Sequence, residues 1–264
     1  MSKAADLASL ASASETALSN RNIVINGAMQ ISQRATSATI SDGANEGYRT
    51  LDRWRVLFSS SAGGVATMSQ DTTVPNTSFK NSIKIDVTTA DTSVSANHAI
   101  TLQQRFEAQD IANSGWDYTN SNAYMSVSFW ARSTKAGTYC VFLFTQDGTP
   151  KNFVQEYTLV ANTWKYVTFN VKGDSGISFN DDNGNGLIVG WTLVAGSNRY
   201  DGVTAGQWIT TSSGSGQGRY ATSNQVNFFD STSNDWYITG VQMEVGPVAT
   251  PFEHRSFGQE LALC

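Results

Sequence analysis

Short runs in which apolar and polar residues alternate recur from residue 22 to residue 245, and this pattern constrains the fold more than any other feature of the sequence. Alternation with a period of two places the apolar side chains on one face of a β-strand. About ten such runs, with no helical periodicity between them, predict an all-β chain folded as an antiparallel β-sandwich. The runs comprise residues 22–34, 51–58, 82–87, 99–106, 123–133, 138–146, 164–171, 186–196, 225–229 and 235–245.

Turn-forming residues separate or interrupt these runs. Asn26 and Gly27 interrupt the first run, where we expect a bulge or a tight turn. Residues 134–137 join the runs 123–133 and 138–146, and this pair is the strongest predicted hairpin of the chain. Tryptophans that lie on or beside predicted strands are expected in the core, with subunit contacts as the alternative for any that are half-exposed: Trp54, Trp130, Trp164, Trp191 and Trp236.

The first twenty residues carry the one helical pattern. Leu7, Leu10 and Leu18 fall near one face at three-to-four spacing. A helix this short is marginal alone in water, so we predict that residues 1–21 dock or oligomerise, with a frayed tail as the alternative. Residues 22–264 are predicted to form a single sandwich domain. The N-terminus has no apolar stretch long enough for a signal peptide or membrane span, which predicts assembly inside the cell and no membrane insertion.

Composition excludes several classes of function. Charged residues make up 15% of the chain, the net charge is -5, and no cluster of Lys and Arg suited to nucleic acid is visible. The two histidines, His98 and His254, lie apart, no serine sits in a nucleophile elbow, and no zinc-ligand cluster is present, so we predict no catalytic residue. Cys140 and Cys264 are expected to be a buried thiol and a free terminal thiol.

Acidic residues raise two further possibilities. Glu107, Asp110 and Asp117 could supply the paired carboxylates of a glycosidase, although solvated loop carboxylates explain them as well. In the loop DDNGNG, Asp181, Asn183 and Asn185 match the first half of a calcium loop. The bidentate glutamate of such a loop is missing, so a structural calcium is one prediction and an ordinary Asx-Gly turn is the other.

Aromatic residues in polar loops are candidate glycan ligands, because aromatic faces stack on sugar rings. Two of them lie within the segment NSGWDYTNSN, and three flank the Ser- and Gly-rich stretch TTSSGSGQGR. Buried plugs beneath these loops are the alternative. The candidates are Trp116, Tyr118, Tyr200, Trp208 and Tyr220.

Two parts of the chain resemble known families. The segments MSVSFWARSTKAGTYCVFLF and YTLVANTWKYVTFNVKGD resemble jelly-roll carbohydrate-binding modules, and the resemblance rests on Phe129, Trp130, Arg132, Ser133, Thr163, Trp164 and Lys165. The flanks resemble a family of bacteriophage tail-fibre and virion appendage proteins, through NIVINGAMQISQR, LDRW and ITGVQMEVGPVATPFEHRSFGQELALC. Many members of that family continue beyond the terminal Leu-Cys with a basic, tyrosine-rich extension.

These resemblances imply a jelly-roll domain in a virion, frequently a homotrimer, that contacts host surface polysaccharide and joins other virion proteins through its N-terminal segment. Two alternatives follow from the same residues. One is a glycan-binding module of a secreted polysaccharide-degrading system, which the absent signal peptide disfavours. The other is a tail-associated depolymerase that would use Glu107 or Asp117.

Overall fold

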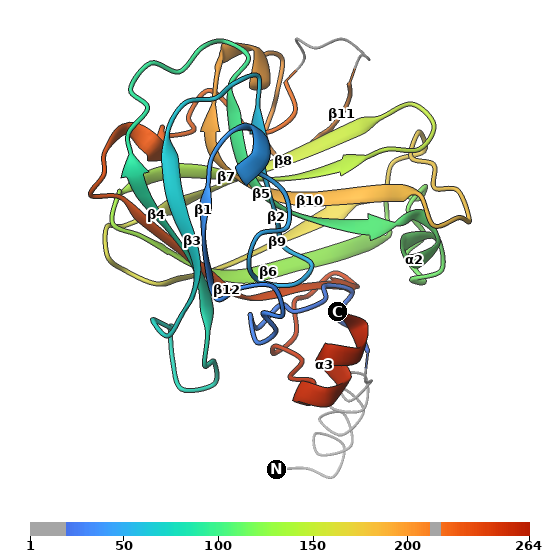
Figure 1. The fold of residues 1–264 in the computed structure, drawn as a ribbon. Helices are drawn as coiled ribbons and strands as arrows, with labels where there is room; N and C mark the ends of the chain where they lie inside the picture. Colours follow the sequence, from blue (N-terminus) through green and yellow to red (C-terminus); the bar gives the residue numbers. More distant parts are fainter. Residues whose placement is uncertain (1–19, 212–217) are drawn as a thin grey trace, which may run out of the picture.

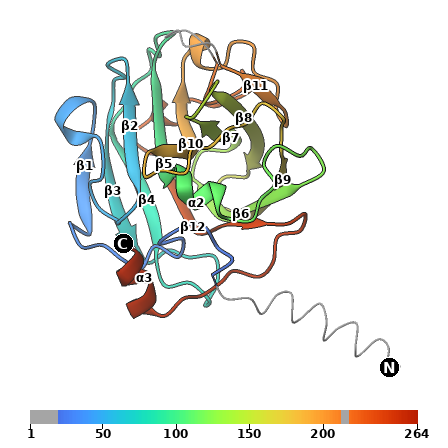
Figure 2. The ribbon, with the colours of Figure 1, turned by 90° about the vertical axis from the view of Figure 1, so that its right-hand side faces the viewer.

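The computed structural model describes residues 20–211 and 218–264. Over these residues the chain forms two six-stranded antiparallel sheets that face one another (Figures 1 and 2). Sheet A consists of β1 (Ser37–Ile40), β3 (Val65–Asp71), β4 (Ser82–Thr89), β12 (Asp235–Val245), β6 (Tyr124–Ser133) and β9 (Lys165–Lys172), in that order. Sheet B consists of β11 (Trp208–Thr210), β8 (Lys151–Leu159), β7 (Gly137–Thr145), β10 (Asn185–Ala195), β5 (Ala99–Glu107) and β2 (Arg55–Ser59).

Eight of these strands have the order of a jelly roll. From β4 onward the chain changes sheet at each step apart from the β7–β8 hairpin and the step from β10 to β11. This path places β4-β12-β6-β9 side by side in sheet A and β5-β10-β7-β8 side by side in sheet B. This is the order produced by two interlocked Greek keys. The predicted all-β sandwich is therefore confirmed. Strands β1 and β3 extend sheet A beyond β4, while β2 and β11 extend the two edges of sheet B.

The core lies between the inner faces of the sheets and is centred on aromatic side chains. Trp191 contacts Trp54 with ring centroids 5.5 Å apart and meets Phe129 edge-on at 5.4 Å. Trp236 is also fully buried. These three tryptophans thus occupy the predicted core. Trp130 and Trp164 are only half-buried and do not.

The outer faces of the two sheets differ. Phe142 on β7 and Ile188 on β10 point outward from sheet B and are covered by Tyr220 and Ala221 from the loop between β11 and β12. The same apolar layer buries Cys140, and both cysteines are free thiols. Sheet A has no comparable apolar lid among the described residues, so its outer face is where a ligand can approach strand side chains.

The predicted hairpin between residues 123–133 and 138–146 is wrong. β6 pairs with β12 and β9 in sheet A, whereas β7 pairs with β10 and β8 in sheet B. The short connection instead carries the chain from one sheet to the other. It is held by Tyr139, whose hydroxyl lies 2.9 Å from Ser133 Oγ and donates to the carbonyl oxygen of Lys135 at 2.9 Å. Two apolar strands that are adjacent in sequence bury the same side chains whether they pair in one sheet or face each other across the core.

Two further predicted strands are absent. In residues 225–229, Gln225 forms an isolated bridge with Thr138, and the 3-10 helix η3 (Phe228–Asp230) begins three residues later. Residues 22–34 form an extended segment with a turn rather than a ladder strand. Backbone hydrogen bonds join it to β12, from Ile23 N to Met243 O at 2.8 Å and from Val241 N to Gly27 O at 3.0 Å. The predicted turn at Asn26 is confirmed, since its φ is 57°.

Helical structure in the described chain is short. It comprises α2 (Ala108–Ala112), α3 (Phe257–Leu263) and the 3-10 turns η1 (Gly43–Asn45), η2 (Ser197–Arg199) and η3. A capping box between Ser256 and Gln259 starts α3. Within residues 20–211 and 218–264, no helix has the length and apolar character needed to cross a bilayer. The predicted docking leucines Leu7, Leu10 and Leu18 lie outside the described residues.

Candidate functional site

An aromatic groove lies on the outer face of sheet A and has a volume of about 580 Å³. Its floor is formed by Trp130 of β6, Tyr166 of β9 and Gly240 of β12, and its far wall by loop residues that include Phe252 and His254. The complete lining is Asn76, Ser78, Phe79, Ser128, Trp130, Tyr166, Gly240, Ala249, Thr250, Pro251, Phe252 and His254. We refer to these residues as the aromatic groove.

Strand alternation explains the floor. Phe129 points into the core, so its neighbour Trp130 points out of the sheet. Tyr166 is the register partner of Trp130 on β9, and their ring centroids lie 5.2 Å apart with the planes tilted by 42°. Tyr166 is 41% exposed, so the pair presents ring surface to solvent.

The opposite wall is a second cluster of rings. The centroids of Phe79 and Phe252 lie 5.3 Å apart, those of Phe79 and His254 lie 5.5 Å apart, and those of Phe252 and His254 lie 4.9 Å apart. Phe79 is buried and supports the two loop residues, which are more exposed. Rings on both sides therefore border one apolar cleft.

Gly240 keeps the floor of the groove clear. It lies where the register between β12 and β6 shifts, and its φ of 61° is strained for any residue with a side chain. A Cβ placed there would lie 2.7 Å from Phe79 Cζ and 3.2 Å from Trp130 Cδ1. The glycine thus allows the two aromatic clusters to approach the strand on either side.

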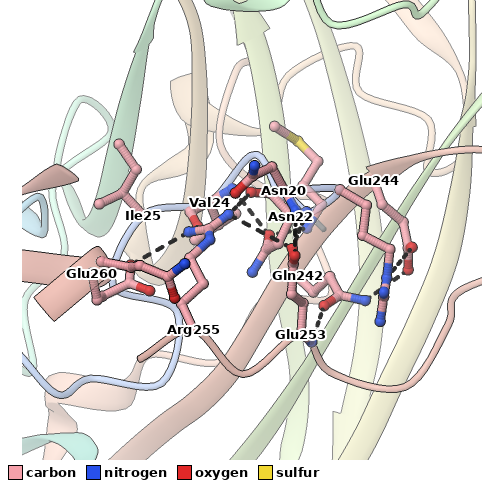
Figure 3. Close-up of polar contacts among 12 residues, drawn as sticks. Asn20, Asn22, Val24, Ile25, Gln242, Glu244, Glu253, Arg255 and Glu260 are labelled. Carbon is pink, nitrogen blue, oxygen red and sulfur yellow. Dashed lines mark hydrogen bonds and ion pairs between the residues drawn. The ribbon is translucent and has the colours of Figure 1, made fainter. Parts of the chain in front are cut away.

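A network of polar contacts holds the loop that forms the groove wall. In Figures 1 and 2 the described chain begins beside the C-terminal segment, next to β12. Glu253 accepts hydrogen bonds from the backbone N–H groups of Asn20 and Asn22, the latter at 2.8 Å, and its own N–H donates to Gln242 Oε1 at 2.7 Å (Figure 3). We refer to the contacts of Glu253, Arg255 and Glu260 with residues 20–26 as the terminal clasp.

Arg255 is the central cation of the clasp. Its guanidinium donates to the carbonyl oxygens of Asn22 and Val24, the latter at 3.2 Å, and lies 3.5 Å from Glu260 Oε1 (Figure 3). Its side chain is only 8% exposed. Glu260 in turn accepts from the backbone N–H of Asn26.

Two asparagines lock the N-terminal segment in place. The amide oxygen of Asn22 accepts from Val24 N and Met243 N, both at 3.0 Å. Asn26 Nδ2 donates to the carbonyl oxygen of Ile31 at 2.8 Å, and its Oδ1 accepts from Ile31 N at 3.0 Å. Both side chains are buried, so these bonds replace a strand ladder in fixing residues 22–31.

Residues 252–255 contribute alternately to the aromatic groove and to the terminal clasp. Phe252 and His254 line the groove, whereas Glu253 and Arg255 point to the N-terminal segment. Extended backbone places successive side chains on opposite sides, which produces this division. The flank segments that stood out in the sequence are therefore in contact, and together they position the groove wall.

The five aromatic residues predicted from the sequence do not form one site. Trp116 is 2% exposed and Tyr220 is 9% exposed, and both are packed as plugs beneath their loops, so neither ring face is free for a sugar. Tyr220 covers Phe142 of sheet B at 4.9 Å. Tyr118 is half-buried and contacts Phe179 edge-on at 4.9 Å. For Trp116 and Tyr220 the exposed-platform prediction is corrected to the packing alternative.

The other two predicted aromatics lie elsewhere. Tyr200 packs against the apolar layer on sheet B. Trp208 lines a separate pocket of about 400 Å³ beside Tyr124 and Lys172, and its indole N–H donates to the carbonyl oxygen of Lys172 at 2.7 Å. Trp208 is thus the predicted residue that still borders a solvent-accessible pocket.

The predicted calcium residues form a turn at the start of β10. Asp181 accepts from Asn113 Nδ2 at 3.0 Å, and the neighbouring Asp182 accepts from Gly184 N at 2.9 Å, as in an Asx turn. Asn183 and Asn185 line a pocket that also contains arginines. These contacts favour the Asx-turn alternative, and calcium binding stays a prediction.

Among the remaining titratable candidates, Glu107 and Asp110 lie near one another. Burial and the nearby carboxylate of Glu107 raise the pKa of Asp110. Asp117 accepts from Asn120 Nδ2 at 3.0 Å within its own turn. His98 lies 3.6 Å from Asp91, while His254 belongs to the groove wall.

Comparisons with known proteins assign no family to the chain. No protein-family model matches the sequence, and no curated protein is similar to it. Among solved structures, a CBM4 module aligns at 16% identity and a TM-score of 0.40, covering 84% of this chain and 98% of its own. A putative sugar-binding protein from Bacteroides thetaiotaomicron aligns at 12% identity and 0.39, covering 84% and 99%.

A third similar structure is a family 11 carbohydrate-binding module from Clostridium thermocellum in complex with a β-1,3-1,4-mixed-linked tetrasaccharide. It aligns at 10% identity and a TM-score of 0.38, covering 84% of this chain and 99% of its own. At such scores the likeness says nothing about the ligand of this chain. Any functional assignment therefore depends on the groove itself.

Proposed function

We propose that this protein is a non-catalytic glycan-binding protein whose ligand lies in the aromatic groove. The observation that carries the proposal is the pair Trp130–Tyr166, which exposes ring surface on a rigid sheet opposite a second wall made by Phe252 and His254. Aromatic rings around a concave site with a few polar groups are the usual construction of a small-ligand pocket. Ser128, Thr250 and Asn76 supply hydroxyl and amide groups at its borders.

The lining also indicates the class of glycan. The residues that line the groove include no Asp, Glu, Lys or Arg. An uncharged ligand loses less hydration on entering such a site than a charged one, which would be left without a counter-ion. The volume of about 580 Å³ lies within the range of ligand pockets. A neutral oligosaccharide is therefore the proposed ligand.

Truncation of either floor ring tests the proposal. We expect Trp130→Ala and Tyr166→Ala each to weaken binding to a neutral polysaccharide at least about tenfold, because central aromatic contacts carry most of the affinity of a site. Affinity gel electrophoresis over a panel of neutral β-glucans, galactans and mannans identifies a ligand, and calorimetry with its oligosaccharides measures the dissociation constant.

Phe257→Ala provides a control, because Phe257 is an aromatic residue that is 59% exposed and lies outside the groove. Equal losses for Phe257→Ala and Tyr166→Ala, or full affinity in Trp130→Ala, would place the ligand elsewhere. Release of reducing ends from the bound polysaccharide by the purified protein would contradict the non-catalytic part of the proposal and favour a depolymerase.

A virion appendage is a second proposal, and it rests on the flank segments that resemble phage proteins. The structure brings these segments into contact in the terminal clasp, so they act as one unit. No family model or curated protein supports this assignment. In this proposal a homotrimer is displayed on the particle and joins other virion proteins through residues 1–21.

Removal of residues 1–19 tests the second proposal. The variant keeps Asn20 and Arg21, which contact Glu253 and Glu244 of the body, so we expect an unchanged melting temperature. We also expect the truncated protein to be missing from purified particles, measured by quantitative mass spectrometry against the full-length chain. Normal incorporation of the truncated protein would show that this segment does not dock.

A further inference from the structure

A second pocket is lined by arginines. It lies where β5 ends and β10 begins in sheet B, and it is separate from the aromatic groove. Its volume is about 290 Å³. Arg105 of β5 and Arg53, which precedes β2, contribute to its wall together with Tyr48. The complete lining is Arg34, Tyr48, Arg53, Arg105, Phe106, Glu107, Asn183, Gly184, Asn185 and Cys264. We refer to it as the arginine pocket.

Two of the three guanidinium groups form no close ion pair within the described chain, although Arg105 lies near the carboxylate of Glu46 and Arg53 lies near that of Asp110. Arg34 is paired with Asp52, with Arg34 Nη1 2.6 Å from Asp52 Oδ1. For Arg53 and Arg105, by contrast, no hydrogen bond or ion pair joins the side chain to any part of the described chain. Glu107 is the one carboxylate side chain in the lining, and it accepts from Gln109 Nε2 at 2.7 Å.

Arg105 is the more unusual of the two. Its Nε atom is buried and lacks a hydrogen-bond partner in the protein. Burial and the neighbouring guanidinium of Arg55 lower its pKa, so its positive charge is held at a cost. A buried donor without a partner is unfavourable, because it has lost its hydrogen bonds to water. An anion bound in the pocket would offset the positive charges of Arg53 and Arg105 and could accept hydrogen bonds from their guanidinium groups.

We infer that the arginine pocket binds an oxyanion on a small ligand, such as the carboxylate of an acidic sugar or a sulfate ester. Guanidinium groups present fixed pairs of N–H donors that match carboxylate and sulfate oxygens. The exposed ring of Tyr48 and the amide groups of Asn183 and Asn185 border the same space and could contact the rest of the ligand. The small volume suits one sugar unit rather than a long chain.

This inference differs from the neutral-glycan proposal in both place and chemistry. The lining of the aromatic groove contains no Asp, Glu, Lys or Arg. The lining of the arginine pocket contains three arginines and one glutamate. The two pockets share no lining residue. A ligand bearing both neutral and acidic units could therefore use both, but each site can be tested alone.

Calorimetry with the full-length protein tests the pocket. Sodium glucuronate, glucose and sodium sulfate are each titrated into the protein. Glucose has the same ring as glucuronate without the carboxylate, and sulfate is an inorganic oxyanion. Ionic strength is held constant with sodium chloride, because diffuse attraction to surface cations is screened by salt. We expect saturable binding of glucuronate, sulfate or both, and none of glucose.

Arg53→Asn is the decisive variant. Arg53 has a φ of 70°, and Asn accepts this conformation better than most residues, so the change removes the guanidinium with little strain. We expect oxyanion affinity to fall at least about tenfold. Lys165→Gln removes the same charge from an exposed site on β9 and should leave affinity unchanged, as should Trp130→Ala in the aromatic groove.

The outcomes separate the possibilities. Binding of glucuronate but not sulfate identifies an acidic sugar, and the reverse identifies a sulfate ester. Absence of binding by both anions, or equal affinity for glucose, overturns the inference. Equal losses in Arg53→Asn and Lys165→Gln also overturn it, because they would show that only net charge matters. If Trp130→Ala still binds the oxyanion, the arginine pocket acts independently of the site in the neutral-glycan proposal.

Discussion

Replacement of Arg255 by alanine is expected to lower the free energy of unfolding by about 3–5 kcal/mol. The guanidinium is almost fully buried, and its removal takes this donor from the carbonyl oxygens of Asn22 and Val24. The carboxylate of Glu260 keeps the N–H of Asn26 but loses the cation paired with it. Breaking a buried charged network from one side costs more than the network contributes as a whole, because the remaining groups stay buried. Urea denaturation followed by tryptophan fluorescence measures the change.

A matched variant separates this effect from a simple change in charge. Lys135 pairs with Asp230 at 2.7 Å, but both side chains are substantially exposed. Lys135→Ala is therefore expected to cost no more than about 1 kcal/mol. If the two variants unfold at similar urea concentrations, the clasp does not stabilise the fold.

Replacement of Asn26 by alanine is expected to cost about 4 kcal/mol, from two sources. Its side chain makes three buried hydrogen bonds to backbone groups of Ile31 and Asp52, at 2.8, 3.0 and 3.0 Å. Each partner left unsatisfied costs about 1–3 kcal/mol. Its φ of 57° adds strain of about 1–2 kcal/mol for alanine. The melting temperature and the urea midpoint should both fall.

Asn26→Gly divides the two contributions. Glycine removes the strain but makes none of the side-chain bonds, so this variant should be more stable than Asn26→Ala by about 1 kcal/mol and less stable than the parent chain. Equal stability of the glycine variant and the parent would show that the hydrogen bonds to Ile31 and Asp52 contribute nothing.

Strand alternation predicted most of the jelly roll, because each strand buries one face against the opposite sheet. It located β4, β5, β6, β7, β9, β10 and β12 closely. It did not locate β3 or β8, whose inward positions include small or polar-flanked residues such as Ala66 and whose apolar runs are short. It also could not decide between a hairpin and a crossover after β6, since both bury the same residues.

The candidate site was largely missed for a different reason. Trp130 was assigned to the core, although Phe129 and Ala131 beside it already fill the inward positions of β6. That alternation could have placed Trp130 on the outer face. The facing wall could not have been found in this way, because Phe252 and His254 come from a loop more than a hundred residues further along the chain, and only the three-dimensional arrangement brings them opposite Trp130.

The alternate roles of residues 252–255 suggest which positions to change in order to alter ligand recognition. Substitutions at 252 and 254 change the surface that faces a ligand, while 253 and 255 keep the backbone anchored. A library randomised at the first pair and fixed at the second should yield mostly folded variants with different ligand preferences. The reverse library should yield few soluble proteins.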